Sequence, residues 1–387
     1  MKRRPVDIFV ATHMAEAYGP QWVLRDYLRD RGKRFAMVTC PFDYAKIPRA
    51  EVEWYDQGAL EGKQDGHKNN THGVLSWIRD AWLVWRSGWK FMGRESVFIG
   101  INNLHATVGI LLKWLGKGKT VVYYVIDYTP QRFPNPFINA LYQRVARFAA
   151  AHADMVWNLS ERMRAVHRRF RARESTSIMV PIGLDTQEFK VADEADVIRT
   201  QWVVVSTLFE SKGVQLAIAG LTFVPEATLV IVGTGPYRDE LIALAKRLEV
   251  TERVTFLGMA GRKELYAVLA HSRVALAPYL PDPANYSYYA DPAKPKEYLA
   301  CGVPTVITRV PWIAEAIETE PMGFAIEYDA KELADACRKL MEDNLLWRHC
   351  RENALEFTRD LAWETVFDRA FVELKKLTDK YPKIQTN

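Results

Sequence analysis

LVIVGTGPYRDEL, residues 229–241, joins a short apolar run to a glycine turn and the start of a helix pattern. This order is typical of a strand–helix unit whose strand is buried in a parallel sheet. The alternation recurs along the chain, so the sequence predicts an α/β fold. The other apolar runs are Asp7–Thr12, Phe35–Cys40, Ser96–Ile101, Thr120–Ile126, Asp154–Asn158, Trp202–Val205, Val254–Leu257, Val274–Ala277 and Pro304–Ile307.

The 387 residues suffice for two domains at roughly 150 residues each. The alternation pauses in a polar, acidic segment at residues 192–195 and then restarts. We therefore expect a Rossmann-like N-terminal domain over residues 1–190 and a Rossmann-like C-terminal domain over residues 198–355. A helix within residues 360–387 is expected to pack back on the first domain. Two such open sheets facing a central cleft hold ligands at the carboxyl ends of their strands.

The net charge of +5 hides an uneven distribution. Residues 1–190 carry 29 Lys and Arg against 18 Asp and Glu, a net +11, while the rest of the chain carries 23 against 29, a net −6. The basic half is expected to meet an anionic partner. A non-enzymatic nucleic-acid-binding protein is one reading, but no base-stacking module is recognisable and the other half is acidic. We therefore expect no nucleic-acid partner.

The cysteines and the apolar runs bear on location. Cys40, Cys301, Cys337 and Cys350 show no C-x-x-C spacing, which argues against a disulfide framework and a zinc site. Asp7 interrupts any signal-peptide core, and no apolar run reaches the ~18 residues of a spanning helix. These features predict a cytoplasmic protein, peripheral at the inner face of the plasma membrane.

Two segments of the second half carry groups suited to a phosphate. Gly233 and Gly235 bring backbone N–H groups toward an anion, although a plain strand–helix turn has the same pattern. In VSTLFESKG, residues 205–213, Lys212 stands where the next helix begins. There it either neutralises a phosphate or lies on the solvated surface.

The segment DPAKPKEYLACGVPT, residues 291–305, carries the strongest pattern. Lys294 and Glu297 lie three residues apart, on one face of a short helix that ends at Gly302. An ordinary capped helix with a surface ion pair fits these residues. The hydroxyls of a ribose need a carboxylate acceptor, and a diphosphate needs a cation one turn away; Glu297 and Lys294 provide both.

These segments together resemble the GT-B-fold glycosyltransferases of the large GT4-like group. The resemblance implies a nucleotide-sugar donor, expected to be a UDP-sugar, in the C-terminal domain and an acceptor in the N-terminal domain. It also implies that Glu297 binds the donor ribose, that Lys212 and Lys294 contact the diphosphate, and that Gly258 and Met259 meet the base. The segments that carry it are VPIGLDTQEF (180–189), STLFESKG (206–213), VIVGTGPYRDEL (230–241), VTFLG (254–258), LAPY (276–279, ending in Tyr279) and KPKEYLACGVPTV (294–306).

Two positions depart from the GT4 pattern. Ser206 and Thr207 stand where that group usually has a glycine-arginine pair, and Tyr289 replaces a glutamate eight residues before Glu297. Both departures resemble the bacterial exopolysaccharide glucuronosyltransferase branch, of which the xanthan enzyme is an example. Lys296 or Arg309 would then pair with a uronate carboxylate, or be an ordinary surface charge.

The same branch points to two residues of the first half. Its first strand ends in a histidine, which resembles His13, and its proposed base is an aspartate at a later strand end, which resembles Asp127. Asp127 follows an apolar strand and so emerges where an open sheet binds ligands. It is therefore a candidate base for an inverting displacement, or an aspartate that caps a helix.

A tryptophan-rich helix is predicted near residues 77–90. Trp77, Ile78, Ala81, Trp82, Trp85 and Trp89 fall within roughly 140° of a helical wheel, and Arg79, Arg86 and Lys90 border that face. An aromatic face bordered by cations suits an anionic membrane surface, whereas a helix buried against the sheet also uses Trp. The first reading favours a lipid-linked or membrane-associated glycan acceptor.

The sequence thus predicts a glycosyltransferase that needs no metal, because lysines balance the diphosphate. Asp127 would act as the base. A retaining GT4 enzyme with a soluble acceptor is the alternative, and it would not need Asp127.

Overall fold

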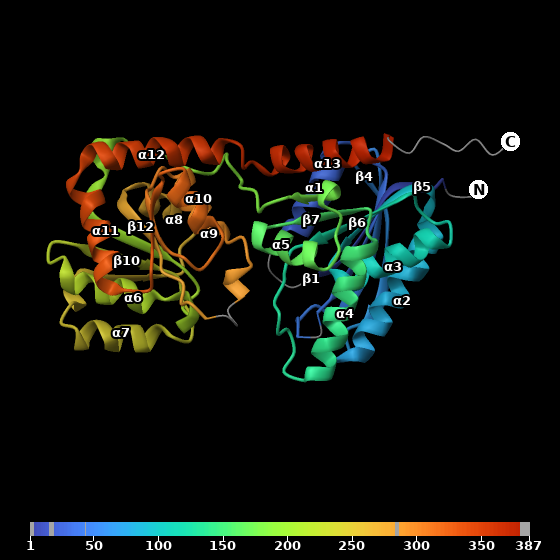
Figure 1. Cartoon of the computed structure of the whole chain (residues 1–387), viewed down its shortest axis with the longest axis horizontal. Helices are drawn as coiled ribbons and strands as arrows, with labels where there is room; N and C mark the ends of the chain where they lie inside the picture. The colour runs from blue at the N-terminus through green and yellow to red at the C-terminus, as the bar shows by residue number, and fades with distance from the viewer. Residues whose placement is uncertain (1–3, 15–18, 43, 283–285, 380–387) are drawn as a thin grey trace. The chain divides into compact units, whose positions relative to one another are not determined.

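The computed structural model describes residues 4–14, 19–42, 44–282 and 286–379. The chain forms two compact units (Figure 1): unit 1 contains Met1–Pro181 and Val366–Asn387, and unit 2 contains Ile182–Thr365. None of the helices in the described ranges has the length and apolar character needed to cross a membrane.

Unit 1 is built on an eight-stranded sheet in the order β4-β3-β2-β1-β5-β6-β7-β8. Its strands from β2 through β1 to β8 pair in parallel, as the sequence predicts, whereas β3 and β4 add an antiparallel hairpin that the apolar runs did not indicate. The exposed, polar β4 forms the edge of the sheet, which explains why it carries no apolar signal. The strands are β1 (Val6–Met14), β2 (Phe35–Pro41), β3 (Arg49–Asp56), β4 (Ala59–Lys68), β5 (Met92–Ile101), β6 (Thr120–Val125), β7 (Met155–Asn158) and β8 (Ser177–Met179).

The helices of this unit include one from the C-terminal end of the chain. Asp368 on that helix accepts a hydrogen bond of 2.7 Å from the Tyr27 hydroxyl, and Phe371 stacks on Tyr27 and makes an edge contact with Trp157. The C-terminal helix from Val366 onward is therefore part of unit 1. The helices are α1 (Pro20–Asp30), α2 (Val74–Phe91), α3 (Asn103–Trp114), α4 (Pro136–His152), α5 (Glu161–Arg169) and α13 (Trp363–Asp379).

Unit 2 is a six-stranded, fully parallel sheet in the order β11-β10-β9-β12-β13-β14. The strands are β9 (Ile198–Val205), β10 (Thr228–Val232), β11 (Val254–Gly258), β12 (Ser272–Ala277), β13 (Thr305–Thr308) and β14 (Gly323–Ile326). The helices are α6 (Val214–Gly220), α7 (Arg238–Arg247), α8 (Arg262–Ala270), α9 (Ala293–Ala300), α10 (Ile313–Thr319), α11 (Ala330–Glu342) and α12 (Asn344–Arg359).

Both faces of the unit 2 sheet are covered, which explains the unbroken apolar run of β9. Trp202 and Val204 belong to one core cluster with residues of α6, α7 and α11, while Val203 and Val205 belong to a second with residues of α8, α9 and α10. Successive side chains of a strand point to opposite faces, so a strand between two helical layers needs apolar residues at every position. Figure 1 shows these helix groups on the two sides of the sheet.

A buried ion pair holds the start of α9. Lys296 and Asp291 lie 2.5 Å apart with fully buried side chains. Asp291 also accepts hydrogen bonds from the Ile182 N–H (2.6 Å) and the Trp312 indole (3.1 Å), while Lys296 donates to the Ile182 carbonyl. Burial raises the pKa of the Asp291 carboxyl and lowers the pKa of the Lys296 amine, and their mutual attraction opposes both shifts.

Replacing Lys296 with Met should lower the free energy of unfolding by about 3 kcal/mol, because it leaves a buried carboxylate without its cation. Urea unfolding followed by circular dichroism measures this change. Arg309→Gln is the control, because it removes a pair with Glu318 that lies on the surface and should leave the unfolding midpoint nearly unchanged. Equal effects of the two substitutions would contradict the role given to the buried pair.

Candidate functional site

The predicted donor residues of unit 2 follow four neighbouring parallel strands. Ser206 and Thr207 follow β9, Gly233 follows β10, Met259 follows Gly258 at the end of β11, and Tyr279 lies just beyond β12. Because the carboxyl ends of parallel strands meet at one edge of a sheet, these residues gather at that edge. The structure thus brings together there the groups that the sequence singled out separately.

The glycine turn after β10 allows two backbone segments to meet. Gly233 has φ 130°, and a Cβ at this position would overlap the Ser206 carbonyl oxygen. A Cβ at Gly235 would overlap the Leu208 backbone. The Gly233 N–H donates to the Gly258 carbonyl at 2.7 Å, which ties the ends of β10 and β11 together. These glycines therefore serve close backbone packing at the edge.

Helix α9 supplies the charged groups at the same edge. The Lys294 ammonium lies 2.8 Å from a Glu297 carboxylate oxygen, and the Glu297 side chain is 14% exposed. The first turn of α9 holds no acidic residue, whereas α7 begins with Asp239 and Glu240. Because negative charge at a helix N-terminus repels an anion, α9 suits a diphosphate better than α7 does. Burial and then the Glu297 carboxylate raise the pKa of Tyr266 to about 12.

Tyr298 positions α9, and the sequence analysis did not identify it. Its hydroxyl accepts a hydrogen bond from the Val205 N–H (2.9 Å) and donates one to the Val205 carbonyl (3.0 Å). Val205 is the last residue of β9, so this bond fixes Lys294 and Glu297 relative to Ser206. In the sequence, only its position directly after Glu297 could have indicated this role. A tyrosine at that position of a helix is equally typical of an ordinary core residue.

Lys212 and the loop after β12 complete this edge. The Lys212 ammonium lies 5.4 Å from the centre of the Tyr279 ring, and the Leu280 N–H donates to the Ser211 carbonyl. The two cations suggested for a uronate lie in different environments. Lys296 is fully buried in its pair with Asp291, so it cannot meet a uronate, whereas Arg309 is an exposed surface charge paired with Glu318 and Glu327.

A cavity of about 710 Å³ lies at the carboxyl ends of β1, β5 and β6 in unit 1. Both catalytic candidates, His13 and Asp127, line it, together with Trp77 from α2 and Tyr142 from α4. Its volume is in the range of small-molecule sites. Unit 1 therefore has a cavity of its own at the strand ends where the sequence places the acceptor.

His13 is held by a buried polar network in this cavity. Its Nε2 lies 3.0 Å from Asp80, and the Asn102 amide lies 2.7 Å from its Nδ1. Burial opposes ionisation of Asp80, but hydrogen bonds from His13 and His67 outweigh it and hold the pKa of the Asp80 carboxyl well below its usual range. Both ring nitrogens of His13 are thus engaged.

Two other residues of this network escaped the sequence analysis. Asp80 is 1% exposed although it lies on the tryptophan-rich helix, and only the fold brings it to His13. Asn102 has φ 109° and ψ 169°, a conformation that is costly for a residue with a side chain. Strain of this kind clusters at functional sites, and here its residue contacts His13 directly.

Asp127 stands at the mouth of the cavity with a cation beside it. Its carboxylate is paired with Arg132, and its side chain is 46% exposed. It does not cap the next helix, because Asn135 caps α4. The pair with Arg132 orients the carboxylate at the lining of the cavity, where a base would have to stand to accept a proton.

The tryptophans of α2 divide between two environments. Trp77 is half-buried, lines the cavity and packs against Phe133. Trp82 and Trp89 are 65% and 49% exposed, and half-buried Trp85 stacks on Trp89. The opposite side of α2, with Asp80 and Val84, is buried. The helix therefore packs on the sheet and also presents an aromatic surface.

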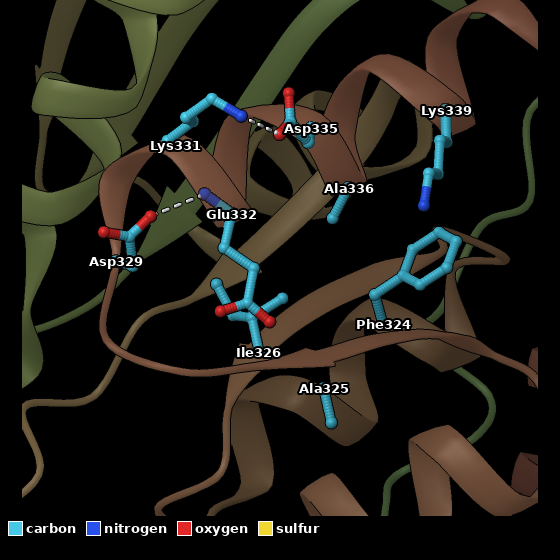
Figure 2. A pocket seen from close by; sticks show the side chains of 9 residues that line it. All are labelled: Phe324, Ala325, Ile326, Asp329, Lys331, Glu332, Asp335, Ala336 and Lys339. Carbon is cyan, nitrogen blue, oxygen red and sulfur yellow. Dashed lines mark hydrogen bonds and ion pairs between the residues drawn. The ribbon is translucent and has the colours of Figure 1, made fainter.

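Two further groups of polar residues lie close together, one in each unit. The thiol, imidazole and carboxylate of Cys40, His67 and Asp80 lie within 4.8 Å of one another, but the Arg79 guanidinium is 3.4 Å from Asp80 and opposes a second positive charge. A hollow of about 360 Å³ lies between β14 and α11 (Figure 2). Its Lys331 is paired with Asp335, and its Asp329 caps α11, so it offers no unsatisfied charge from these groups.

Comparisons with known proteins agree with this description of unit 2. Residues 199–343 match the model of the family described as Glycosyl transferases group 1. The N-acetyl-alpha-D-glucosaminyl L-malate synthase of Bacillus anthracis is 32% identical over 141 residues, which cover 36% of this chain and 35% of that protein. The chain therefore spans about a third of the length of this curated relative.

Solved structures extend the similarity to nearly the whole chain. HepE of Anabaena in complex with UDP has a TM-score of 0.71 at 17% identity and covers 96% of this chain and 100% of its own. The sucrose-phosphate synthase of Thermosynechococcus elongatus has a TM-score of 0.72 at 16% identity with the same coverage. Residues 199–343 thus resemble a glycosyl transferases group 1 domain, and the predicted α/β, GT-B fold is confirmed.

Proposed function

We propose that this chain, with its glycosyl transferases group 1 domain in unit 2, moves a sugar from a nucleoside diphosphate to a hydroxyl of a glycan acceptor. The observation that carries the proposal is that Lys212, Lys294 and Glu297 all belong to the edge of unit 2 where its parallel strands end. The donor is a UDP-sugar in this proposal, supported by the structural neighbour that holds UDP.

The donor site follows from the chemistry of its parts. Glu297 offers two acceptor oxygens to the ribose hydroxyls, and in the free protein Lys294 occupies one of them. A bound diphosphate would draw Lys294 toward its own charge and release that oxygen. Lys212 and the N-terminus of α9 add positive charge, so we propose that the lysines, without a metal ion, steady the leaving diphosphate.

Glu297→Ala should weaken UDP binding by roughly tenfold or more, because the ribose loses a charged hydrogen-bond acceptor. Calorimetry with UDP in the presence of EDTA measures this change and tests the metal-free site together with it. Glu352→Ala, an exposed position within α12, is the matched control and should bind UDP like the wild type. Unchanged affinity in the Glu297 variant would sink the ribose role, and binding only without EDTA would sink the metal-free site.

We assign the acceptor to the cavity of unit 1 and the base to Asp127. Its carboxylate lines the cavity and is held there by its pair with Arg132. His13 has both ring nitrogens engaged, so it can take a proton only after one of these bonds breaks. We therefore give His13 a positioning role in which Asp80 holds its ring, and this assignment supports an inverting displacement rather than the retaining alternative.

Asp127→Asn should lower turnover by at least about a hundredfold while UDP affinity stays the same, because the amide cannot accept the hydroxyl proton. Release of UDP from a UDP-sugar that the wild type uses reports turnover. Asp30→Asn, an exposed position at the end of α1, is the control. Near-normal turnover in the Asp127 variant would place the base elsewhere, and retention of the anomeric configuration in the product would favour the retaining mechanism.

We further propose that the acceptor is lipid-linked or membrane-associated and that the chain acts at the cytoplasmic side of an anionic membrane. The exposed rings of Trp82 and Trp89, together with Lys117 beside Trp89, support this. Ser206, Thr207 and Tyr289, which depart from the GT4 pattern, support a relation to the exopolysaccharide glucuronosyltransferase branch. A soluble acceptor is the alternative.

The double substitution Trp82→Ser and Trp89→Ser should reduce binding to phosphatidylcholine vesicles at least several-fold, because indole rings partition into the interface. Co-sedimentation measures the bound fraction, and the melting temperature tests the fold. Phe223→Ser removes a ring that is 44% exposed in unit 2 and serves as the control. Wild-type binding by the tryptophan variant would contradict membrane contact through α2.

A further inference from the structure

A second hollow of unit 1, about 330 Å³, lies between the edge of the sheet and α2. Residues of β3 and β4 line one side of it, and residues of α2 line the other. It shares no lining residue with the 710 Å³ cavity, although both use α2. This hollow is therefore distinct from the acceptor cavity proposed above.

Three cations of α2 line the hollow. Arg79, Arg86 and Lys90 are seven and four residues apart, which places them within about 40° on the helical wheel. Arg86 is exposed and makes no hydrogen bond or ion pair within the described ranges, and the Lys90 ammonium contacts the neutral Gln64 amide at 3.3 Å. The one acidic lining residue, Asp65, is paired with Arg49. The hollow thus carries uncompensated positive charge.

One lining side chain also holds a buried N–H group without an acceptor. Arg79 donates through its terminal nitrogens to the Lys68 carbonyl and to Asp80, but its Nε has no hydrogen-bond partner among the described residues. Because a buried N–H group without an acceptor is costly, this donor beside a cationic hollow is a position that a bound anion can satisfy.

Trp82 shows which anion fits. Its ring lines the hollow and is 65% exposed, so a ligand that reaches the cations also meets an aromatic surface. Arginine side chains bind phosphate oxygens through two parallel N–H groups, and a phosphate accepts several hydrogen bonds at once. We infer that the hollow between β4 and α2 binds a phosphate group that belongs to an amphiphilic molecule, such as a lipid headgroup, or to a soluble phosphate ester.

The test uses a double variant that carries both Arg86→Gln and Lys90→Gln. The control variant is Arg94→Gln, which changes an exposed arginine on β5. Co-sedimentation with phosphatidylcholine vesicles, with and without phosphatidylglycerol, reports the lipid source. Thermal stabilisation by glycerol phosphate reports the soluble source. Only the vesicle assay rests on the proposed membrane association. UDP binding is measured in every variant to show that unit 2 is intact.

We expect the double variant to lose binding to phosphatidylglycerol vesicles by about 25-fold, since each cation near an anionic surface contributes about fivefold. Its binding to pure phosphatidylcholine, which depends on the tryptophans, should not change. Loss of stabilisation by glycerol phosphate with unchanged vesicle binding would support the site with a soluble ligand instead. If the double variant matches Arg94→Gln in both assays, the hollow is not a phosphate site.

Discussion

The edge of unit 2 where the parallel strands end, and where the donor is proposed to bind, depends on the fully buried pair of Lys296 and Asp291. It fixes the first turn of α9 against Ile182 and Trp312, while the Tyr298 hydroxyl fixes the middle of the same helix to the end of β9. Glu297 lies between these two anchors, and Lys294 lies two residues before the first of them. An ionised pair without solvent is costly to form, so its presence beside the site indicates that position matters more there than stability.

A buried carboxylate plays a comparable part in unit 1. Asp80 contacts His13 and His67, and Arg79 approaches it from the preceding position of α2. The carboxylate thus connects the polar wall of the 710 Å³ cavity to the cationic hollow on the other side of the helix. Any change of charge at Asp80 acts on both places, which makes α2 a structural link between them as well as a cover for the sheet.

How much of this could be predicted depends on whether the signal is local. The run of β9 and the glycine turn at Gly233 are local patterns, so the α/β fold and the donor edge could be predicted from the sequence. Lys294 and Glu297 share one helical turn and could be found in the same way. Asp80 and His13 are 67 residues apart, and the burial of Lys296 depends on Asp291 and Ile182. Contacts of this kind exist only in the folded chain.

The basic first half and the acidic second half of the chain use their charges in different ways. The acidic half of the chain carries the proposed donor site, since two placed lysines and a helix N-terminus can attract a diphosphate whatever the net charge around them. The basic half has exposed cations beside exposed tryptophans on α2, an arrangement that acts over a surface. A charge that neutralises one bound group needs a fixed position. Lys294 gains such a position from α9, whose buried residues Lys296 and Tyr298 anchor the helix. The proposed membrane contact would instead use charge that stays unpaired, as the exposed Arg86 does among the described residues.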